Sequence, residues 1–371
     1  MFRIAFTGDM AFSKYFKTAY ETPNLLSPKI IEFLSSTDVT VANVEAPVSA
    51  RPISSTEVLT HVNHPRITET LEKINAKVWN IANNHSMDCG EQGLKDTLEI
   101  ASKMGAVTIG GGLNLDEARK PLILEEKGIR VGILSVASPL SEQATKNKAG
   151  CFMWDEYKLI KETLKELKET CDHVVVVSHG GEEFTQIPLP FARDKYLKYL
   201  KWGANVVVAH HPHVPQNYEK VDSKIIFYSL GNFIFDTDYQ RNQRNTDIGV
   251  LIKLNFKKDE FDFESLSIKI DRETHTVKET EPLFIFRNID ANTYRKLIPL
   301  AEEDYAVNLW SKFAFTKQTK KICSKRAFFK AKMKRFKFSE RFGILKVIIR
   351  KPFKGWKKAP KELVNYITNI K

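Results

Sequence analysis

The sequence predicts a layered α/β protein with a mixed sheet, and three observations support this prediction. Short apolar runs rich in β-branched residues, such as Val174–Val177 and Val206–Ala209, are typical of strands that are buried on both faces. Amphipathic helical stretches such as Asp155–Thr170 separate many of these runs. After residue 224 the apolar runs follow one another without helices between them, so we expect part of the sheet structure to be antiparallel.

Taken in chain order, strands and helices alternate over most of the sequence. The predicted strands are Arg3–Thr7, Val39–Val44, Val78–Ala82, Val107–Gly110, Gly128–Val136, Val174–Val177, Val206–Ala209, Lys224–Tyr228, Ile248–Asn255 and Glu264–Asp271. The predicted helices are Lys29–Ser35, Arg66–Ile74, Glu91–Met104, Asp155–Thr170, Ala192–Trp202 and Arg287–Trp310. Hydrophobic residues make up 42% of the 371, which is enough to build a sizeable core and excludes a disordered chain.

The net charge of +12 is unevenly distributed along the chain. Residues 317–371 contain 19 Lys and Arg but 2 Asp and Glu, whereas the first 316 residues carry a net charge of −5. The basic character therefore belongs to the C-terminal segment alone, and any preference for acidic partners must reside there. The shift in composition also places a boundary at about residue 316.

Cysteine usage and hydropathy bear on the cellular compartment. The four cysteines form no CxxC pair, which argues against a disulfide framework and against a zinc finger. The N-terminus, MFRIAFTGDM, is unlike a signal peptide, and no run of about 18 apolar residues predicts a membrane span. We therefore expect a cytoplasmic protein, with a peripheral position at the inner membrane surface left open by the basic segment.

Polar and ionisable residues recur directly after the predicted strands. They are Asp9, Asn43, Glu45, Asn83, Asn84, His85, Asp88, His179, His210, His211, His213 and Asn232. In open α/β sheets, ligands bind beyond the carboxyl ends of the strands. Carboxylate, amide and imidazole groups gathered at such an edge favour Mn, Fe or Zn over Ca or Mg. We therefore predict one or two divalent metal ions there, with Glu45 as a shared ligand of adjacent sites.

Taken singly, several of these residues have simpler interpretations. Asp9 fits a turn or a helix cap, Asn83–Asn84 fits a left-handed turn, and His179 fits a solvent-facing loop. The cluster His210–His213 is harder to explain in this way, because three of nine histidines occupy four positions after one strand. His211 and His213 form an HxH pair that is able to face neighbouring metal ions.

Six motifs together resemble those of the poly-γ-glutamate capsule-biosynthesis CapA family, within the calcineurin-like metallophosphoesterase superfamily. In chain order they are TGDM (Thr7–Met10), NVEAP (Asn43–Pro47), ANNHSMDCGEQGL (Ala82–Leu94), SHGGEEF (Ser178–Phe184), HHPHVPQ (His210–Gln216) and YSLGNFIFD (Tyr228–Asp236). The resemblance implies a four-layer αββα sandwich of the metallo-dependent phosphatase type over residues 1–290. A helical connector, 291–316, and a basic amphipathic C-terminal extension, 317–371, would then follow.

The resemblance also implies roles for individual residues. The expected metal ligands are Asp9, Glu45, Asn84, His179, His211 and His213, and the expected catalytic residues are His210 and His85. The wider superfamily usually carries a histidine two residues after the first Asp, where this chain has Ala11.

The implied function is capsule or other surface-polymer biosynthesis, of poly-γ-glutamate or polysaccharide. We expect a metal-dependent, phosphoesterase-like hydrolase that uses a metal-bound hydroxide on an anionic polymer or phosphoester. The alternative is a non-catalytic, metal-stabilised module that binds or guides a polymer synthase at the membrane.

Three interpretations of the basic segment 317–371 remain open. Basic residues interleaved with Phe and Trp suit an anionic membrane surface, which is the interpretation we favour. The same charge suits a polyanion, and the simplest alternative is a helix packed on the main domain. Nucleic acid is not an expected partner, because the main domain is acidic and has no recognisable nucleic-acid motif.

Overall fold

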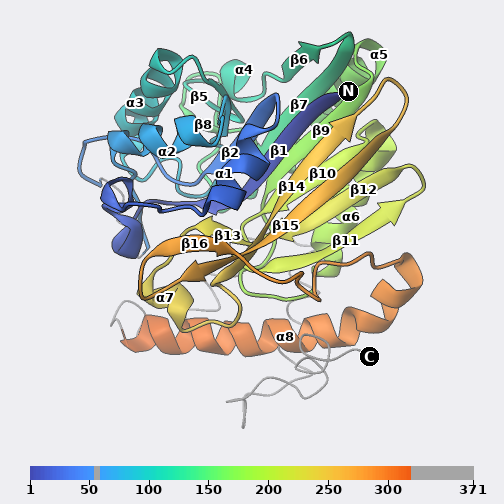
Figure 1. The fold of residues 1–371 in the computed structure, drawn as a ribbon. Coiled ribbons are helices and arrows are strands. Elements are labelled where there is room, and N and C mark those ends of the chain that lie inside the picture. The colour runs from blue at the N-terminus through green and yellow to red at the C-terminus, as the bar shows by residue number, and fades with distance from the viewer. Residues whose placement is uncertain (54–58, 319–371) are drawn as a thin grey trace.

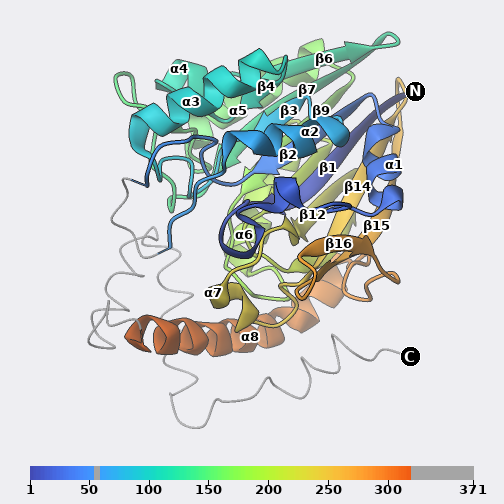
Figure 2. The same ribbon diagram turned by 60° about the vertical axis from the view of Figure 1, so that its left-hand side comes forward.

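The computed structural model describes residues 1–53 and 59–318, and its strands form two large sheets that pack against each other (Figures 1 and 2). The first sheet is mixed. In spatial order its strands are β16 (Thr276–Glu279), β15 (Phe261–Asp271), β14 (Ile248–Phe256), β1 (Phe2–Met10), β2 (Val39–Val44), β3 (Val78–Asn80) and β4 (Val107–Ile109), with β13 (Asn232–Ile234) also beside β1. β1 to β4 are parallel, whereas β14 to β16 are antiparallel, as the helix-free C-terminal part of the sequence predicted.

The second sheet has a parallel centre and antiparallel edges. Its order is β11 (Pro215–Val221), β12 (Lys224–Leu230), β10 (Val206–His210), β9 (His173–His179), β7 (Ile129–Ala137) and β6 (Leu122–Glu126). The edge strands β11 and β6 run antiparallel to their neighbours. A small ribbon pairs β5 (Gly111–Gly112) with β8 (Gly150–Cys151).

Helices cover the outer face of each sheet. Apolar side chains of α1 (Pro28–Ser35), α2 (Thr68–Lys73) and α3 (Gly90–Lys103) share a core with the first sheet. Those of α5 (Tyr157–Thr170) and α6 (Pro190–Trp202) share a core with the second sheet. Shorter elements are α4 (Leu115–Ala118), α7 (Asp238–Arg241) and the 3-10 helices η1 (Lys14–Phe16), η2 (Ala19–Glu21) and η3 (Pro65–Ile67).

A third core lies between the two sheets and explains the apolar strand runs. Val206 and Val208 of β10 face this inter-sheet core, together with Ile4 and Phe6 of β1. Val207, between them in sequence, faces the helices α5 and α6 instead. Because successive strand residues point to opposite faces, a strand between two apolar layers has to be apolar throughout. The predicted αββα sandwich is therefore confirmed.

The structure also revises several of the predicted elements. Edge strand β11 was missed because it begins with a proline and has polar residues, both of which an edge tolerates. Edge strand β6, which is partly exposed, was missed as well. The helix expected over Arg66–Ile74 is a 3-10 turn followed by the six-residue α2.

The C-terminal helix α8 (Ala291–Gln318) runs along the lower side of the molecule in both ribbon views. It includes the residues of the predicted connector, 291–316, and begins later than the predicted Arg287, while the predicted division into domains stays a prediction. Nearly all of the extension 317–371 lies outside the described residues, so its predicted amphipathic character stays a prediction. Among the described helices, none is both long and apolar enough to cross a membrane.

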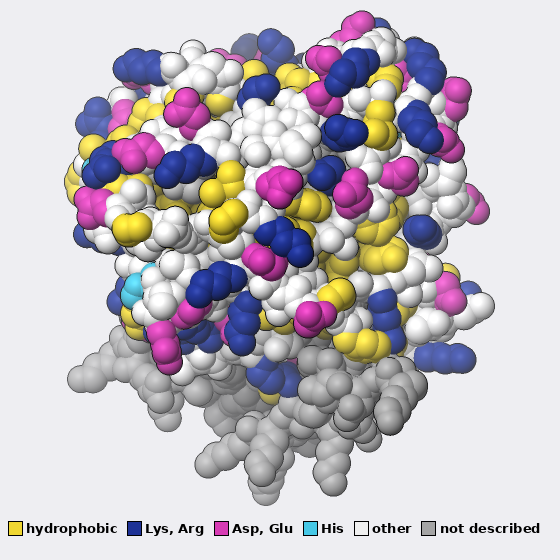
Figure 3. All heavy atoms as spheres, in the orientation of Figure 1, with side chains coloured by type: hydrophobic (Ala, Val, Ile, Leu, Met, Phe, Trp, Pro, Cys, Tyr) yellow, Lys and Arg dark blue, Asp and Glu magenta, His cyan; other side chains and the backbone are white. Residues whose placement is uncertain are grey.

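Acidic and basic side chains are interspersed on the face of the molecule seen in Figure 3. This mixture agrees with the small net charge of the first 316 residues.

Candidate metal centre

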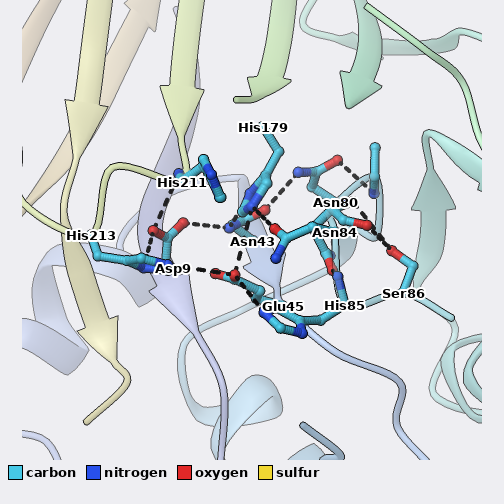
Figure 4. Close-up of polar contacts among 12 residues, drawn as sticks. Asp9, Asn43, Glu45, Asn80, Asn84, His85, Ser86, His179, His211 and His213 are labelled. Carbon is cyan, nitrogen blue, oxygen red and sulfur yellow. Dashed lines mark hydrogen bonds and ion pairs between the residues drawn. The ribbon is translucent and has the colours of Figure 1, made fainter. Parts of the chain in front are cut away.

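The predicted site residues lie where strands of both sheets end. In the first sheet, Asp9 on β1 pairs in register with Asn43 on β2 and with Asn232 on β13. In the second sheet, His179 on β9 pairs with His210 on β10. Because the sheets are packed face to face, these ends meet, and Figure 4 shows the carboxylates and imidazoles pointing toward one another.

Two groups of side chains that could hold a metal ion share one carboxylate. Glu45, His179 and His211 form one group, and Asp9, Glu45 and His213 form the other. Within each group the ligand atoms lie within 4.8 Å of one another. Mixed carboxylate and imidazole donors suit Mn, Fe or Zn, and a carboxylate common to both groups is what a bridged pair of ions requires.

Glu45 provides the strongest test of whether a cation fits here. It is fully buried, yet neither carboxylate oxygen accepts a hydrogen bond from the described residues. Its Oε1 lies 3.6 Å from His179 Nε2 and 3.9 Å from His213 Nε2. Burial raises the pKa of the Glu45 carboxyl well above its usual range. Since a buried, unsatisfied carboxylate is costly, these residues fit a bound cation that would neutralise it.

Asn84 lies beside His179, which is compatible with the predicted ligand set. Asn84 Oδ1 is 2.9 Å from His179 Nε2, so both atoms border the same space. Burial, reinforced by the neighbouring histidines, holds the pKa of His179 well below its usual range. The neutral imidazole that results is the form that binds metal ions.

His213 contacts the carboxylate of Asp9 and the amide of Asn232. Its Nδ1 is 3.1 Å from Asp9 Oδ2 and 3.1 Å from Asn232 Oδ1. Burial by itself would lower the pKa of His213, but the charges of Glu45 and Asp9 outweigh it and raise this pKa to about 9. In the absence of a metal ion, a proton on this imidazole therefore offsets part of the carboxylate charge.

The backbone of the site loops is held in an uncommon conformation. Ala46, His211 and His213 have positive φ values of 103°, 94° and 57°. Residues with side chains rarely adopt this region, and each such residue costs roughly 1–3 kcal/mol. Strain of this kind collects at functional sites, where it fixes the direction of a side chain.

His85 is oriented by a neighbouring carboxylate. Its Nδ1 is 2.8 Å from Asp88 Oδ2, and its Nε2 faces Glu45 Oε1 at 3.9 Å. Asp88 Oδ2 also accepts a hydrogen bond from the backbone N–H of His61 at 2.6 Å, which fixes the carboxylate in place. One ring nitrogen of His85 is thereby directed toward the shared carboxylate.

His210, the other predicted catalytic residue, has a different environment. Its Nε2 lies 2.9 Å from the carbonyl oxygen of Thr7, which ties β10 to β1 across the two sheets. It belongs to neither of the two donor groups that share Glu45. The contacts of His210 are those of a residue that joins the sheets.

A chain of buried amide side chains lies behind the centre and positions Asp9. This role was not predicted from the sequence. Asn80 Nδ2 donates to Asn43 Oδ1 at 2.6 Å, and Asn43 Nδ2 donates to Asp9 Oδ1 at 2.7 Å. Ser135 of the second sheet donates to Asn80 Oδ1. Asn43 had been noted as a strand-end residue, but Asn80 had not. A polar residue inside the apolar run Val78–Ala82 was the signal that could have revealed it.

His61 was also missed, and no strand or motif marks it in the sequence. Its ring centroid lies 4.5 Å from that of His85, and its Nδ1 lies 2.9 Å from Ser13 Oγ. Burial holds the pKa of His61 well below its usual range. A neutral imidazole therefore packs against one wall of the centre.

Together, the fold and the site define a two-sheet α/β protein with a buried centre compatible with metal ions. Residues 3–237 match the family model described as bacterial capsule synthesis protein PGA_cap. The chain belongs to this family, which confirms the resemblance expected from its motifs.

Relatives of this chain include two capsule proteins from Bacillus. The PGA biosynthesis protein CapA of Bacillus subtilis (strain 168) is 30% identical over 68% of this chain and 67% of its own length. The capsule biosynthesis protein CapA of Bacillus anthracis is 30% identical over 57% of this chain and 54% of its own length. The chain thus spans between about half and two thirds of these relatives. Among solved structures, a 5'-nucleotidase precursor from Thermus thermophilus is 13% identical, with a TM-score of 0.44, over 74% of this chain and 55% of that one.

Proposed function

We propose that this protein is a metal-dependent hydrolase of capsule-polymer synthesis that cleaves a phosphoester or amide bond in an anionic substrate. The observation that carries the proposal is Glu45, a buried carboxylate with no hydrogen bond from the described residues and shared by two donor groups. Membership of the capsule synthesis family supports the assignment to surface-polymer metabolism.

The donor groups suggest two positions for Mn, Fe or Zn. Asp9, Glu45 and His213 would hold an ion at one position. Glu45, His179 and His211 would hold an ion at the other, with Asn84 Oδ1 beside them. Bound divalent ions supply an activated water and positive charge against the charge that develops during hydrolysis.

His85 is the better placed of the two predicted proton donors. Its hydrogen bond to Asp88 leaves Nε2 directed toward Glu45, where a substrate held at the centre would lie. A positioned imidazole of this kind gives a proton to a leaving group. His210 is less suited to the role, because its Nε2 already contacts the carbonyl of Thr7.

The first experiment measures the metal content of the purified protein beside Glu45→Ala and His211→Ala variants. We expect about one or two Mn, Fe or Zn ions per chain in the parent and a loss of most of them in both variants. His64→Ala, which removes an exposed histidine outside the centre, serves as the matched control and should retain its metal. No bound metal in the parent, even after incubation with Mn, Fe and Zn, would contradict the proposal.

Hydrolysis is then assayed on phosphomonoesters, phosphodiesters and γ-linked glutamate amides. We expect turnover of at least one class by the parent and none by Glu45→Ala. Metal binding without turnover of any class would instead favour the non-catalytic alternative, in which the domain binds or guides a polymer synthase.

We propose further that the basic segment 317–371 holds the protein at the inner surface of the membrane. The proposal is supported by the charge of this segment, 19 basic against 2 acidic residues. Each Lys or Arg near an anionic surface contributes about 1 kcal/mol, and salt screens the attraction. The full chain should sediment with phosphatidylserine vesicles at low salt and dissociate at high salt. Absence of binding at low salt would exclude this location.

A further inference from the structure

A third donor group overlaps the centre and contains a residue with no role in the scheme above. The ligand atoms of Glu183, His211 and His213 lie within 4.8 Å of one another. His211 also belongs to one of the two groups that share Glu45, and His213 belongs to the other. The Glu183 carboxylate therefore lies close to one donor residue from each of the two groups.

Glu183 and Glu45 differ in their access to solvent. Glu45 is fully buried, whereas Glu183 is partly exposed. Glu183 nevertheless lies at the centre, because a carboxylate oxygen of Glu183 is within 4.8 Å of ring nitrogens of both His211 and His213. Glu183 is therefore a partly solvent-accessible carboxylate beside the HxH pair.

The loop that carries Glu183 is anchored directly after it. The backbone N–H of Phe184 donates to the carbonyl of Pro212, between the two histidines, at 2.7 Å. The carbonyl of Phe184 accepts a hydrogen bond from Asn308 Nδ2 of α8, also at 2.7 Å. Phe184 itself has a φ of 65°, a costly conformation that these contacts maintain.

One helical turn away from Asn308, α8 contacts the same loop again. Asp304 Oδ2 accepts a hydrogen bond from the backbone N–H of Gln186 at 2.5 Å. The side chain of Asp304 also pairs with Arg244 at 3.2 Å. Helix α8 thus contacts the loop at Phe184 and at Gln186, and these contacts hold the adjacent Glu183 carboxylate near the HxH pair.

We propose that Glu183 is a further ligand of the metal centre, which adds a carboxylate oxygen from the solvent side to divalent ions held by His211 and His213. This inference rests on the proposed function, because it requires that the two histidines bind metal. Carboxylate and imidazole together suit Mn, Fe and Zn, and a partly exposed ligand is one that an anionic substrate can reach.

The test compares Glu183→Gln with Glu182→Gln in the full chain. Glu182 is the adjacent carboxylate in sequence and belongs to none of the donor groups among the described residues, so it is a matched control. Titration calorimetry with Mn²⁺ should show at least about tenfold weaker binding for Glu183→Gln and parent-like binding for Glu182→Gln. Glu183→Asp, which keeps a carboxylate, should recover part of the affinity. Thermal melts of all variants control for folding.

The visible absorption of the Co²⁺-loaded proteins distinguishes a ligand from a nearby charge. Loss of a ligand changes the coordination of Co²⁺, so the Glu183→Gln spectrum should differ from that of the parent. Weaker Mn²⁺ binding with an unchanged Co²⁺ spectrum would overturn the ligand assignment, as would unchanged affinity. If Glu45→Gln abolishes binding while Glu183→Gln binds like the parent, this inference alone fails. If the parent binds no metal, both proposals fail.

Discussion

Strand β1 crosses two regions of opposite character within a few residues. Ile4 and Phe6 lie in the apolar core between the sheets, whereas Asp9 lies in the polar centre at the strand end. Both regions are buried, but they differ in how their groups are satisfied. The inter-sheet core consists of side chains that need no partners beyond close packing, whereas the centre contains carboxylates that burial penalises.

The difference indicates how stability and function are divided in this fold. The inter-sheet core and the outer helices supply the free energy of folding. The centre destabilises the folded chain, because Glu45 is unsatisfied and the loop residues His211 and His213 are strained. A ligand that binds only the folded chain returns stability by mass action. We therefore expect core substitutions to change stability alone, and substitutions in the centre to change stability and binding in opposite directions.

The largest effect on stability is expected from Phe227→Ala in the inter-sheet core. Phe227 is fully buried and lies 5.0 Å from Phe263 and 5.9 Å from Tyr218, measured between ring centroids. Truncation should reduce the free energy of unfolding by about 3–5 kcal/mol, because transfer and cavity terms add. Urea denaturation measures the loss, and the amount of metal bound per folded chain should not change. If the variant kept its stability but bound less metal, the expectation that core substitutions change stability alone would be wrong.

A smaller effect of opposite sign is expected from Glu45→Leu in metal-free protein. The substitution removes a buried carboxylate that accepts no hydrogen bond from the described residues. The metal-free variant should be more stable than the metal-free parent by about 1–3 kcal/mol, the cost of an unsatisfied buried polar group. Urea denaturation in EDTA measures this gain. Adding Mn²⁺ should then stabilise the parent but leave the variant unchanged. Equal stabilisation of both proteins by Mn²⁺ would show that Glu45 does not bind the metal ion.

The smallest effect concerns Asp304, which braces the loop next to the centre. Burial raises the pKa of Asp304 to about 7, from the ordinary 3.8. Between these values the folded chain holds a proton that the unfolded chain lacks, so stability falls as the pH rises through this window. An asparagine at this position cannot ionise, so the variant does not lose stability over this pH range. We therefore compare the melting temperatures of Asp304→Asn and the parent. The difference, variant minus parent, should be about 2–4 °C larger at pH 8 than at pH 5. A constant difference would show that Asp304 does not titrate in this range.

Much of the fold could be predicted from the sequence, because each layer leaves a local pattern. β2 was predicted with its observed bounds, and α5 to within two residues of its start, because β-branched runs and amphipathic periodicity are local properties. Edge strands β6 and β11 were missed, since an edge is partly exposed and tolerates polar residues and proline.

The candidate site was predicted in part, and the missed residues have a common reason. Asp9, Glu45 and His213 belong to recognisable motifs at strand ends, and the structure brings them together. His61 lies outside these motifs, and Glu183 lies within the motif Ser178–Phe184 but was not predicted as a ligand. Both reach the same centre by loops whose course depends on distant contacts. For Glu183 these contacts include Asn308, which lies 124 residues beyond Phe184 in the sequence.

The sequence by itself determined the layered α/β class, the strands that end in carboxylate, amide and imidazole residues, and the confinement of the basic charge to residues 317–371. These are properties of composition and local periodicity, which require no knowledge of which segments meet. The tertiary structure alone decided which side chains complete the two donor groups that contain Glu45, and that His210 ties the sheets together. It also decided that α8 braces the loop carrying Glu183. Such relations arise when segments far apart in the chain pack together, and a linear pattern does not encode them.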